Sequence, residues 1–200
     1  MHFFSTLASL TALIGMVALT DALEVLSRTE DCTPFKRGYL AANVTGVFTS
    51  FTVNSEDSIS YIGNKQNPLR IEFQKCATLQ DQGPGKLIDT NGRVYVPSKG
   101  KCIAISNVND PTGPYFTTLL PCDTTPPFRF LIRNDIEAKG GIYWYGITDE
   151  EGTDPQGGCG LLGYKANSLG IPVVTQKTRA ISVTCGGYPG HPFEIAKKPH

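Results

Sequence analysis

Short runs of apolar residues alternate with polar residues along most of the chain, and Gly, Pro, Asn and Asp separate the runs. This pattern is typical of short β-strands joined by tight turns. It is clearest between Gly92 and Ile132, where it predicts strands at Val94–Val96, Ile103–Ile105, Phe116–Leu120 and Phe128–Ile132. The same pattern predicts further strands at Tyr39–Val44, Val47–Val53, Ile59–Ile62, Leu69–Phe73, Ile142–Gly146, Leu161–Tyr164, Ile171–Val174 and Ala180–Val183.

The alternation also indicates which side chains face the core. In the strand Leu69–Phe73, the apolar residues at alternate positions are expected to point inward, and Arg70 and Glu72 are expected to point outward. Beyond the first 22 residues, no segment of helical length carries apolar residues at a spacing of three to four. The chain is therefore expected to be all-β.

The longest apolar run is Phe3–Leu19, in which Ser, Thr and Gly are interspersed. Thr20 and Ala22 place small residues at the minus-three and minus-one positions of a cleavage site, so residues 1–22 are expected to be a removed signal peptide. A membrane anchor is the alternative, because the run approaches the length that spans a bilayer. After cleavage, residues 23–200 would form a single secreted, extracellular domain with no membrane association.

The charges of the chain are balanced. Lys and Arg together number 18, as do Asp and Glu, so the formal net charge is zero. This balance argues against nucleic acid and anionic membranes as partners. All six cysteines follow the apolar run, and an even number in a secretory context indicates disulfides. Because no two cysteines have the C-x-x-C spacing of zinc ligands, neither a metal site nor a cofactor is expected.

Related phrases end at three of the cysteines: LRIEFQKC at Cys76, FTTLLPC at Cys122 and RAISVTC at Cys185. The GKC that ends at Cys102 is echoed by the GGC that ends at Cys159. Three copies of about four strands each favour closure into one small barrel, which leaves no exposed strand edge. One disulfide per copy is then expected, with pairing between copies as the alternative. The expected pairs are Cys32–Cys76, Cys102–Cys122 and Cys159–Cys185.

The motifs of the Gly92–Ile132 stretch follow a familiar order. Gly100-Lys101-Cys102-Ile103 precedes Thr112-Gly113-Pro114-Tyr115, and Leu119-Leu120-Pro121-Cys122 comes next. In this order the stretch resembles one lobe of a ricin-B-type β-trefoil lectin, with Phe128-Arg129-Phe130 where the family has Gln-x-Trp. The resemblance is partial over residues 157–195, where Phe193-Glu194-Ile195 takes that place, and faint before residue 80. It implies a β-trefoil fold and a carbohydrate-binding function.

The resemblance also implies where sugar-binding residues should lie, and the chain departs from the family there. Family lectins that bind galactose use an Asp two residues after the first cysteine of a lobe and an aromatic side chain on the next strand. Ala104 and Leu161 occupy the Asp positions, while Leu120 and Val183 occupy the aromatic positions. Any carbohydrate would therefore be bound by different residues.

Two other groups of residues carry the side chains that sugar recognition needs, namely planar polar groups and aromatic faces. The first group is Asn107, Asn109, Asp110 and Tyr115 in the loop Ser106–Tyr115. The alternative interpretation is that these residues serve the turns of the loop itself.

The second group is Tyr143, Trp144 and Tyr145. Alternation sends Trp144 to one side of its strand and both tyrosines to the other. The favoured interpretation places Trp144 in the core and the tyrosines on the rim, and the alternative makes either side a carbohydrate platform. Asn43 begins the N-glycosylation sequon Asn43-Val44-Thr45.

Catalysis is not expected. The acidic residues of the segment Asp149–Asp154 favour a solvated turn over a calcium site or a pair of catalytic carboxylates. After removal of the signal peptide the histidines are His191 and His200, and no pattern of nucleophile and base is visible.

The sequence therefore predicts a secreted, lectin-like protein that binds extracellular or cell-wall carbohydrate through non-standard residues. Two alternatives remain open. One is a secreted β-trefoil protease inhibitor, which would present an exposed loop to an enzyme. The other is an effector-like protein that binds a host protein. The expected partner is thus a carbohydrate or an extracellular protein.

Overall fold

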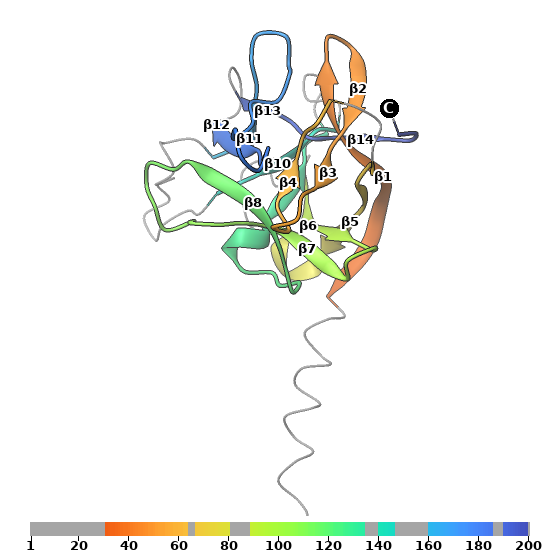
Figure 1. Ribbon diagram of the computed structural model, residues 1–200. Coiled ribbons are helices and arrows are strands. Elements are labelled where there is room, and N and C mark those ends of the chain that lie inside the picture. Colours follow the sequence, from red (N-terminus) through yellow and green to blue (C-terminus); the bar gives the residue numbers. More distant parts are fainter. Residues whose placement is uncertain are drawn as a thin grey trace, which may run out of the picture. The chain divides into compact units, whose positions relative to one another are not determined.

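The computed structural model describes residues 31–63, 67–80, 89–134, 140–146, 160–185 and 190–199 (Figure 1). Within these ranges the chain forms strands and two short 3₁₀ turns, at Ala77–Leu79 and Pro126–Phe128, and no α-helix. The prediction of an all-β chain is confirmed. The strands are β1 (Cys32–Val44), β2 (Val47–Ser50), β3 (Thr52–Val53), β4 (Ile59–Ser60), β5 (Arg70–Cys76), β6 (Thr90–Val96), β7 (Lys101–Ile105), β8 (Tyr115–Leu120), β9 (Phe130–Ile132), β10 (Ile142–Trp144), β11 (Leu162–Lys165), β12 (Ser182–Cys185), β13 (Gly190–His191) and β14 (Glu194–Ala196).

Six of the strands form a closed ring of antiparallel pairings. β1 pairs with β14 on one side and with β5 on the other. The ring continues through β5–β6, β6–β9 and β9–β10. A bridge between Ile142 of β10 and Phe193, the residue before β14, brings the pairing back to its start. Every strand of this ring therefore has a neighbour on both sides, which removes exposed edges.

The remaining strands form pairs that extend from the ring. β2 pairs with the end of β1, and β3 pairs with β4. β7 pairs with β8, and β11 pairs with β12 and β13. β8 and β12 also pair with each other, through Phe116 with Ser182 and Tyr115 with Val183. Two pairs that lie far apart in the sequence are thus joined directly.

The core lies between the ring and these pairs, and most strands contribute to it. Its largest fully buried side chains include Trp144, Tyr164, Phe51, Phe73 and Phe130. Phe51 contacts both Tyr164 and Phe193 with ring centroids 5.4 and 5.5 Å apart. Apolar burial of this extent is the main favourable contribution to folding.

Several strands differ from their predicted bounds. β1 begins at Cys32 rather than at Tyr39, because Lys36 and Arg37 pair with β5 after a bulge between Pro34 and Lys36. The predicted strand Val47–Val53 is divided into β2 and β3. Two consecutive prolines begin a 3₁₀ turn, so β9 starts only at Phe130. The prediction of a strand at Ile171–Val174 is wrong, since only isolated bridges form there.

The expected inward face of Leu69–Phe73 is confirmed, and the outward face is half wrong. Arg70 is exposed, but Glu72 is buried with 7% of its surface accessible. The register places Arg37 beside Glu72, and its Nε donates to Glu72 Oε2. Gln74 Nε2 donates to Glu72 Oε1 at 2.9 Å, and Arg93 Nε donates to Gln74 Oε1 at 2.8 Å. A carboxylate can be buried here because these neighbours supply its hydrogen bonds.

Two of the predicted disulfides are confirmed. Cys32 and Cys76 are bonded across the β1–β5 pairing, and Cys102 is bonded to Cys122. The third expected pair includes Cys159, which lies outside the described residues. Two disulfides fit an extracellular protein.

The equivalence of the three cysteine-ending phrases is partly wrong. β5, which ends at Cys76, belongs to the closed ring. β8 and β12, which precede Cys122 and end at Cys185, pair with each other outside it. The phrase LRIEFQKC therefore occupies a different structural position from the other two, although its spacing of apolar residues is similar.

The expected signal peptide, residues 1–22, lies outside the described residues. In the described ranges, no helix has the length and apolar content needed to cross a membrane.

Candidate binding site

The polar residues of the Ser106–Tyr115 loop hold the loop itself in shape. Asn107 has a φ of 52° and donates from its amide nitrogen to the Pro114 carbonyl at 2.6 Å. Asp110 Oδ1 accepts from both the backbone nitrogen and the hydroxyl of Thr112, at 2.9 Å each, and these bonds lower the pKa of the Asp110 carboxyl. Tyr115 donates its hydroxyl to the Asp110 carbonyl at 2.5 Å. The structure thus favours the interpretation of these residues as turn residues.

The tryptophan belongs to the core, as the favoured interpretation of the sequence predicted. Trp144 is fully buried, and its Nε1 donates to the Pro126 carbonyl at 2.9 Å. Tyr115 packs against it with ring centroids 5.6 Å apart. Because both rings are buried, neither offers a free aromatic face in this structure.

The two tyrosines beside Trp144 differ from each other. Tyr145 was expected on the rim but is buried, with 3% of its surface accessible, and burial raises the pKa of its hydroxyl to about 12. Tyr143 is half-buried and lines a hollow in the surface. Of the aromatic residues proposed from the sequence, Tyr143 therefore has the position of a binding residue.

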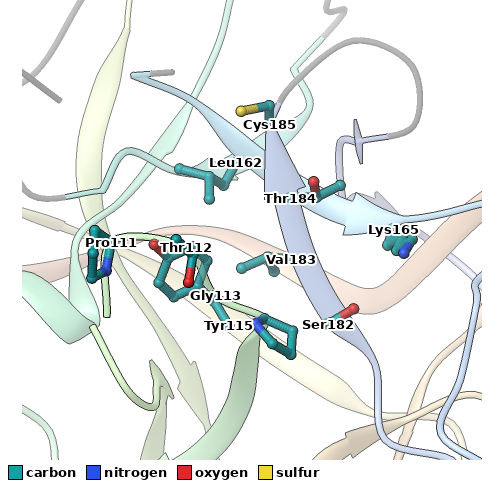
Figure 2. Close-up of a pocket in the computed structure, with 11 residues that line it drawn as sticks. Pro111, Thr112, Gly113, Tyr115, Leu162, Lys165, Ser182, Val183, Thr184 and Cys185 are labelled. Atoms are coloured by element: carbon teal, nitrogen blue, oxygen red, sulfur yellow. The ribbon is translucent and has the colours of Figure 1, made fainter. Parts of the chain in front are cut away.

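One surface hollow lies beside the Ser106–Tyr115 loop and is called the Tyr115 hollow. It has a volume of about 600 Å³ and lies between residues 111–115, β11 and β12. Figure 2 shows the Val183 side chain pointing from β12 toward this loop. Val183 and Leu162 are buried and apolar, whereas Lys165 on β11 is exposed. The lining also includes the polar side chains of Thr112, Ser182 and Thr184, so the hollow combines an apolar floor with hydroxyls and the Lys165 ammonium but has no side-chain amide or carboxyl.

The second hollow has a volume of about 500 Å³ and is called the His191 hollow. It lies where the β1–β2 turn, β10, the loop after β11 and the β13–β14 segment meet. It collects aromatic rings, an amide, hydroxyls and a carboxyl in one place. Its polar and aromatic lining residues are Asn43, Thr45, Tyr143, Tyr164, Ser168, His191 and Glu194.

A hydrogen bond in the β1–β2 turn and two glycines allow the segments that line the His191 hollow to lie close together. Gly46 donates its backbone nitrogen to Asn43 Oδ1 at 2.9 Å and so closes the β1–β2 turn. A Cβ at Gly170 would lie 2.4 Å from the Asn43 carbonyl oxygen, so the loop after β11 can approach the turn only with glycine there. A Cβ at Gly163 would lie 2.1 Å from the His191 carbonyl oxygen, so β13 can lie against β11 for the same reason.

The electrostatics of the His191 hollow are set by burial. Burial raises the pKa of the Glu194 carboxyl to about 7, although Lys36 opposes the shift. Burial also raises the pKa of Tyr164 well above its ordinary value. The imidazole of His191 stacks on Tyr164 with centroids 5.8 Å apart. Its Nε2 atom is buried and has no hydrogen-bond partner within the described part of the chain. His191 is therefore a polar residue of the hollow whose hydrogen-bonding capacity is not fully used.

The sequence-predicted site is thus divided by the fold. The Ser106–Tyr115 loop contains Asn107, Asp110 and the exposed Asn109, and its last residue, Tyr115, lines the Tyr115 hollow. Tyr143 lines the His191 hollow instead. Asn43, the expected glycosylation site, is exposed on the rim of the His191 hollow. The acidic segment 149–154 and His200 lie outside the described residues.

Residues of the His191 hollow that the sequence did not indicate include Tyr164, His191 and Glu194. No local motif marks them, because they come from separate strands that meet only through the pairing of β11 with β13 and of β1 with β14. Among the described residues, no group of three or more His, Cys, Asp and Glu side chains lies close enough to hold a metal ion.

Comparisons of the chain with protein-family models, with curated proteins and with solved structures gave no match.

The raised pKa of Glu194 predicts a pH dependence of stability. The folded protein holds the Glu194 proton up to about pH 7, whereas the unfolded chain releases it near the ordinary value of 4.5. The contribution of Glu194 to the free energy of unfolding is therefore fully present below pH 4.5 and is lost as the pH rises toward 7. In Glu194→Gln this part of the decline should disappear. Urea unfolding of both proteins at a series of pH values measures it, and parallel pH curves for the two proteins would contradict it.

Proposed function

We propose that the protein is a secreted β-trefoil with lectin-like activity, which binds extracellular or cell-wall carbohydrate in the His191 hollow. The closed ring of six strands, with pairs of strands extending from it, supports the fold part of this proposal. A β-trefoil has the same arrangement, in which a six-stranded barrel carries three outer hairpins. The two disulfides support the extracellular part.

One observation carries the functional part: the His191 hollow combines aromatic rings with an amide, hydroxyls and a carboxyl. A sugar has an apolar face of C–H groups and an edge of hydroxyls, so it is recognised by an aromatic surface together with planar hydrogen-bonding groups. Tyr143 and His191 are both half-buried and can offer ring surface to a ligand, while Asn43 and Glu194 supply planar polar groups. The Tyr115 hollow lacks this combination.

We propose binding rather than catalysis. Glycoside hydrolysis commonly needs two carboxyl groups that face each other across the sugar. Glu194 is the only carboxyl among the described residues that line the His191 hollow.

The test is a screen of the refolded or secreted protein against a broad set of immobilised glycans. We expect binding to at least one class of glycan. Tyr143→Ala should weaken that binding by about 3- to 10-fold, because an aromatic contact contributes about 0.5–1.5 kcal/mol. Leu120→Ala, which shortens an exposed side chain elsewhere, is the matched control and should bind as the natural protein does. The absence of any glycan binding by folded protein would sink the proposal.

A protein partner is the second candidate, and exposed apolar side chains favour it. Val47, Phe48 and Leu169 are each more than one-third exposed, and they lie on the β1–β2 hairpin and on the loop after β11. Exposed apolar residues that gather on neighbouring loops are typical of protein interfaces. Inhibition of trypsin-like, subtilisin-like or papain-like proteases in a titration would support the inhibitor function. Binding of a purified host protein to the natural protein, and loss of that binding in Leu169→Asp, would support the effector function.

A further inference from the structure

The Glu194 carboxyl gives the His191 hollow a negative charge, which favours a positively charged ligand. Glu194 lies on β14 opposite Ala41 of β1, and its side chain is half-buried in the lining. Within the described part of the chain, ion pairs form at Glu72 and Asp57, and none forms at Glu194. A carboxylate in this position is partly removed from water, and Lys36 acts on it without forming the ion pair that buried charges usually have.

From this arrangement we infer that the His191 hollow takes an amino sugar, whose ammonium group lies at Glu194 and whose ring lies against Tyr143 and His191. The inference rests on the proposed function and names its ligand class. It follows from three features together: the hollow itself, the unpaired carboxylate, and the aromatic rings beside it.

A primary ammonium fits this environment better than an anion or a neutral amide. An opposite charge beside a half-buried carboxylate is attracted more strongly than it would be in water, because the local dielectric constant is lower. An ammonium is also attracted to the faces of aromatic rings. A carboxylated or sulfated sugar would meet repulsion from Glu194, and an N-acetylated sugar would leave the carboxylate without a charged partner.

The sugar part of the ligand is favoured over a simple alkyl amine by the remaining lining. Asn43 and Ser168 add an amide and a hydroxyl to the lining, and Thr45 adds a second hydroxyl. Several hydrogen-bonding groups in one hollow suit a ligand with several hydroxyls. A short alkyl amine would leave most of them unpaired.

The groups around Glu194 set the pH at which such a ligand would bind. They are Lys36 on β1, Tyr143 on β10, Tyr164 on β11 and His191 on β13. Lys36 carries the positive charge that acts on Glu194, but it is not part of the lining. Because burial holds the pKa of Glu194 at about 7, the carboxylate forms fully only above neutral pH. The amine of a glucosamine residue loses its proton near neutral pH, because the neighbouring oxygens withdraw electron density. Binding should therefore be strongest near about pH 7 and weaken on either side, where the carboxyl is protonated or the amine is neutral.

The experiment compares three oligosaccharides of equal length and linkage by calorimetry: β-1,4-linked glucosamine, its N-acetylated form, and glucose. At about pH 7 we expect the glucosamine oligomer to bind at least about tenfold more tightly than the other two. Glu194→Gln should remove this preference, so that the three oligomers bind with similar affinities. Glu56→Gln removes one negative charge from an exposed site outside the hollow and is the matched control.

Each outcome decides something. Equal binding of the three oligomers, or a preference that survives Glu194→Gln, overturns the ligand class and leaves the proposed carbohydrate-binding function standing. A loss of binding in Glu56→Gln as large as in Glu194→Gln would show attraction by the whole surface rather than by the hollow, and would also overturn the inference. If no glycan of any kind binds to the folded protein, both the inference and the proposed function are wrong.

Discussion

Replacing Trp144 with alanine should lower the free energy of unfolding by about 3–5 kcal/mol. Trp144 is fully buried, and removal of its indole would leave a cavity beside Tyr115 and the neighbouring core residues. The Pro126 carbonyl would also lose the hydrogen bond that it accepts from the indole nitrogen. A loss of this size is a large fraction of the stability of a typical domain.

The measurement is guanidinium unfolding followed by circular dichroism, because Trp144 is the single tryptophan and its replacement removes the intrinsic fluorescence signal. Trp144→Phe is the matched variant, and it should cost less, since a ring still fills most of the space. If Trp144→Ala were as stable as the natural protein, Trp144 would not be a core residue, and the carbohydrate-platform interpretation would return.

Removal of the Cys32–Cys76 disulfide should have the other large effect. The bond joins the first residue of β1 to the last residue of β5, and it spans 44 residues of sequence. In the chain-entropy model, a bridge of this span stabilises the folded state by about 4 kcal/mol, because it restricts the unfolded chain. The double variant Cys32→Ser with Cys76→Ser should therefore unfold at a markedly lower denaturant concentration.

The Cys102–Cys122 bond offers a matched comparison within the same chain. It spans 20 residues, so the same model assigns it about 3 kcal/mol. Urea unfolding of the two double variants, under oxidising conditions that keep the other bridge intact, measures the difference. A greater loss of stability for the Cys102–Cys122 pair would contradict the entropic explanation and would indicate that strain or local packing dominates.

Much of the fold could be predicted from the sequence because its signals are local. The alternation in Leu69–Phe73 identified the buried apolar face, and the position of Cys102 and Cys122 around a turn-rich stretch identified their disulfide. Both depend on residues that are neighbours along the chain. The start of β1 at Cys32 was not predicted, because Lys36 and Arg37 are part of a strand only through their pairing with β5, which lies far along the chain.

Glu72 illustrates the limit of alternation. The pattern placed Glu72 on the face of β5 opposite the apolar residues. Its side chain is nevertheless buried, because Arg37 and Gln74 lie against it and hydrogen-bond to it. Arg37 lies on a different strand, and nothing in the local sequence indicates that the two residues meet. Alternation predicts which face a side chain is on and does not predict what covers that face.

The candidate site was harder to predict than the fold for the same physical reason. Tyr143 was identified because it belongs to a conspicuous aromatic group, although its neighbours Trp144 and Tyr145 are both buried. His191 and Glu194 carry no motif of their own and gain a functional position only through pairings of distant strands. The polar residues of the Ser106–Tyr115 loop had the right chemistry for binding, but their hydrogen bonds are used within the loop.

The pairing of β1 with β14 has a consequence for biosynthesis. β1 is among the first strands to leave the ribosome, and Glu194–Ala196 is the last of the described strands to do so. Until that strand arrives, one edge of β1 carries unpaired backbone groups that can associate with other chains. The ring can be completed only after nearly the whole chain has been synthesised, and contacts between such distant segments form slowly. Newly made protein should therefore depend on chaperones more than a protein of the same size whose strands pair mainly with their neighbours.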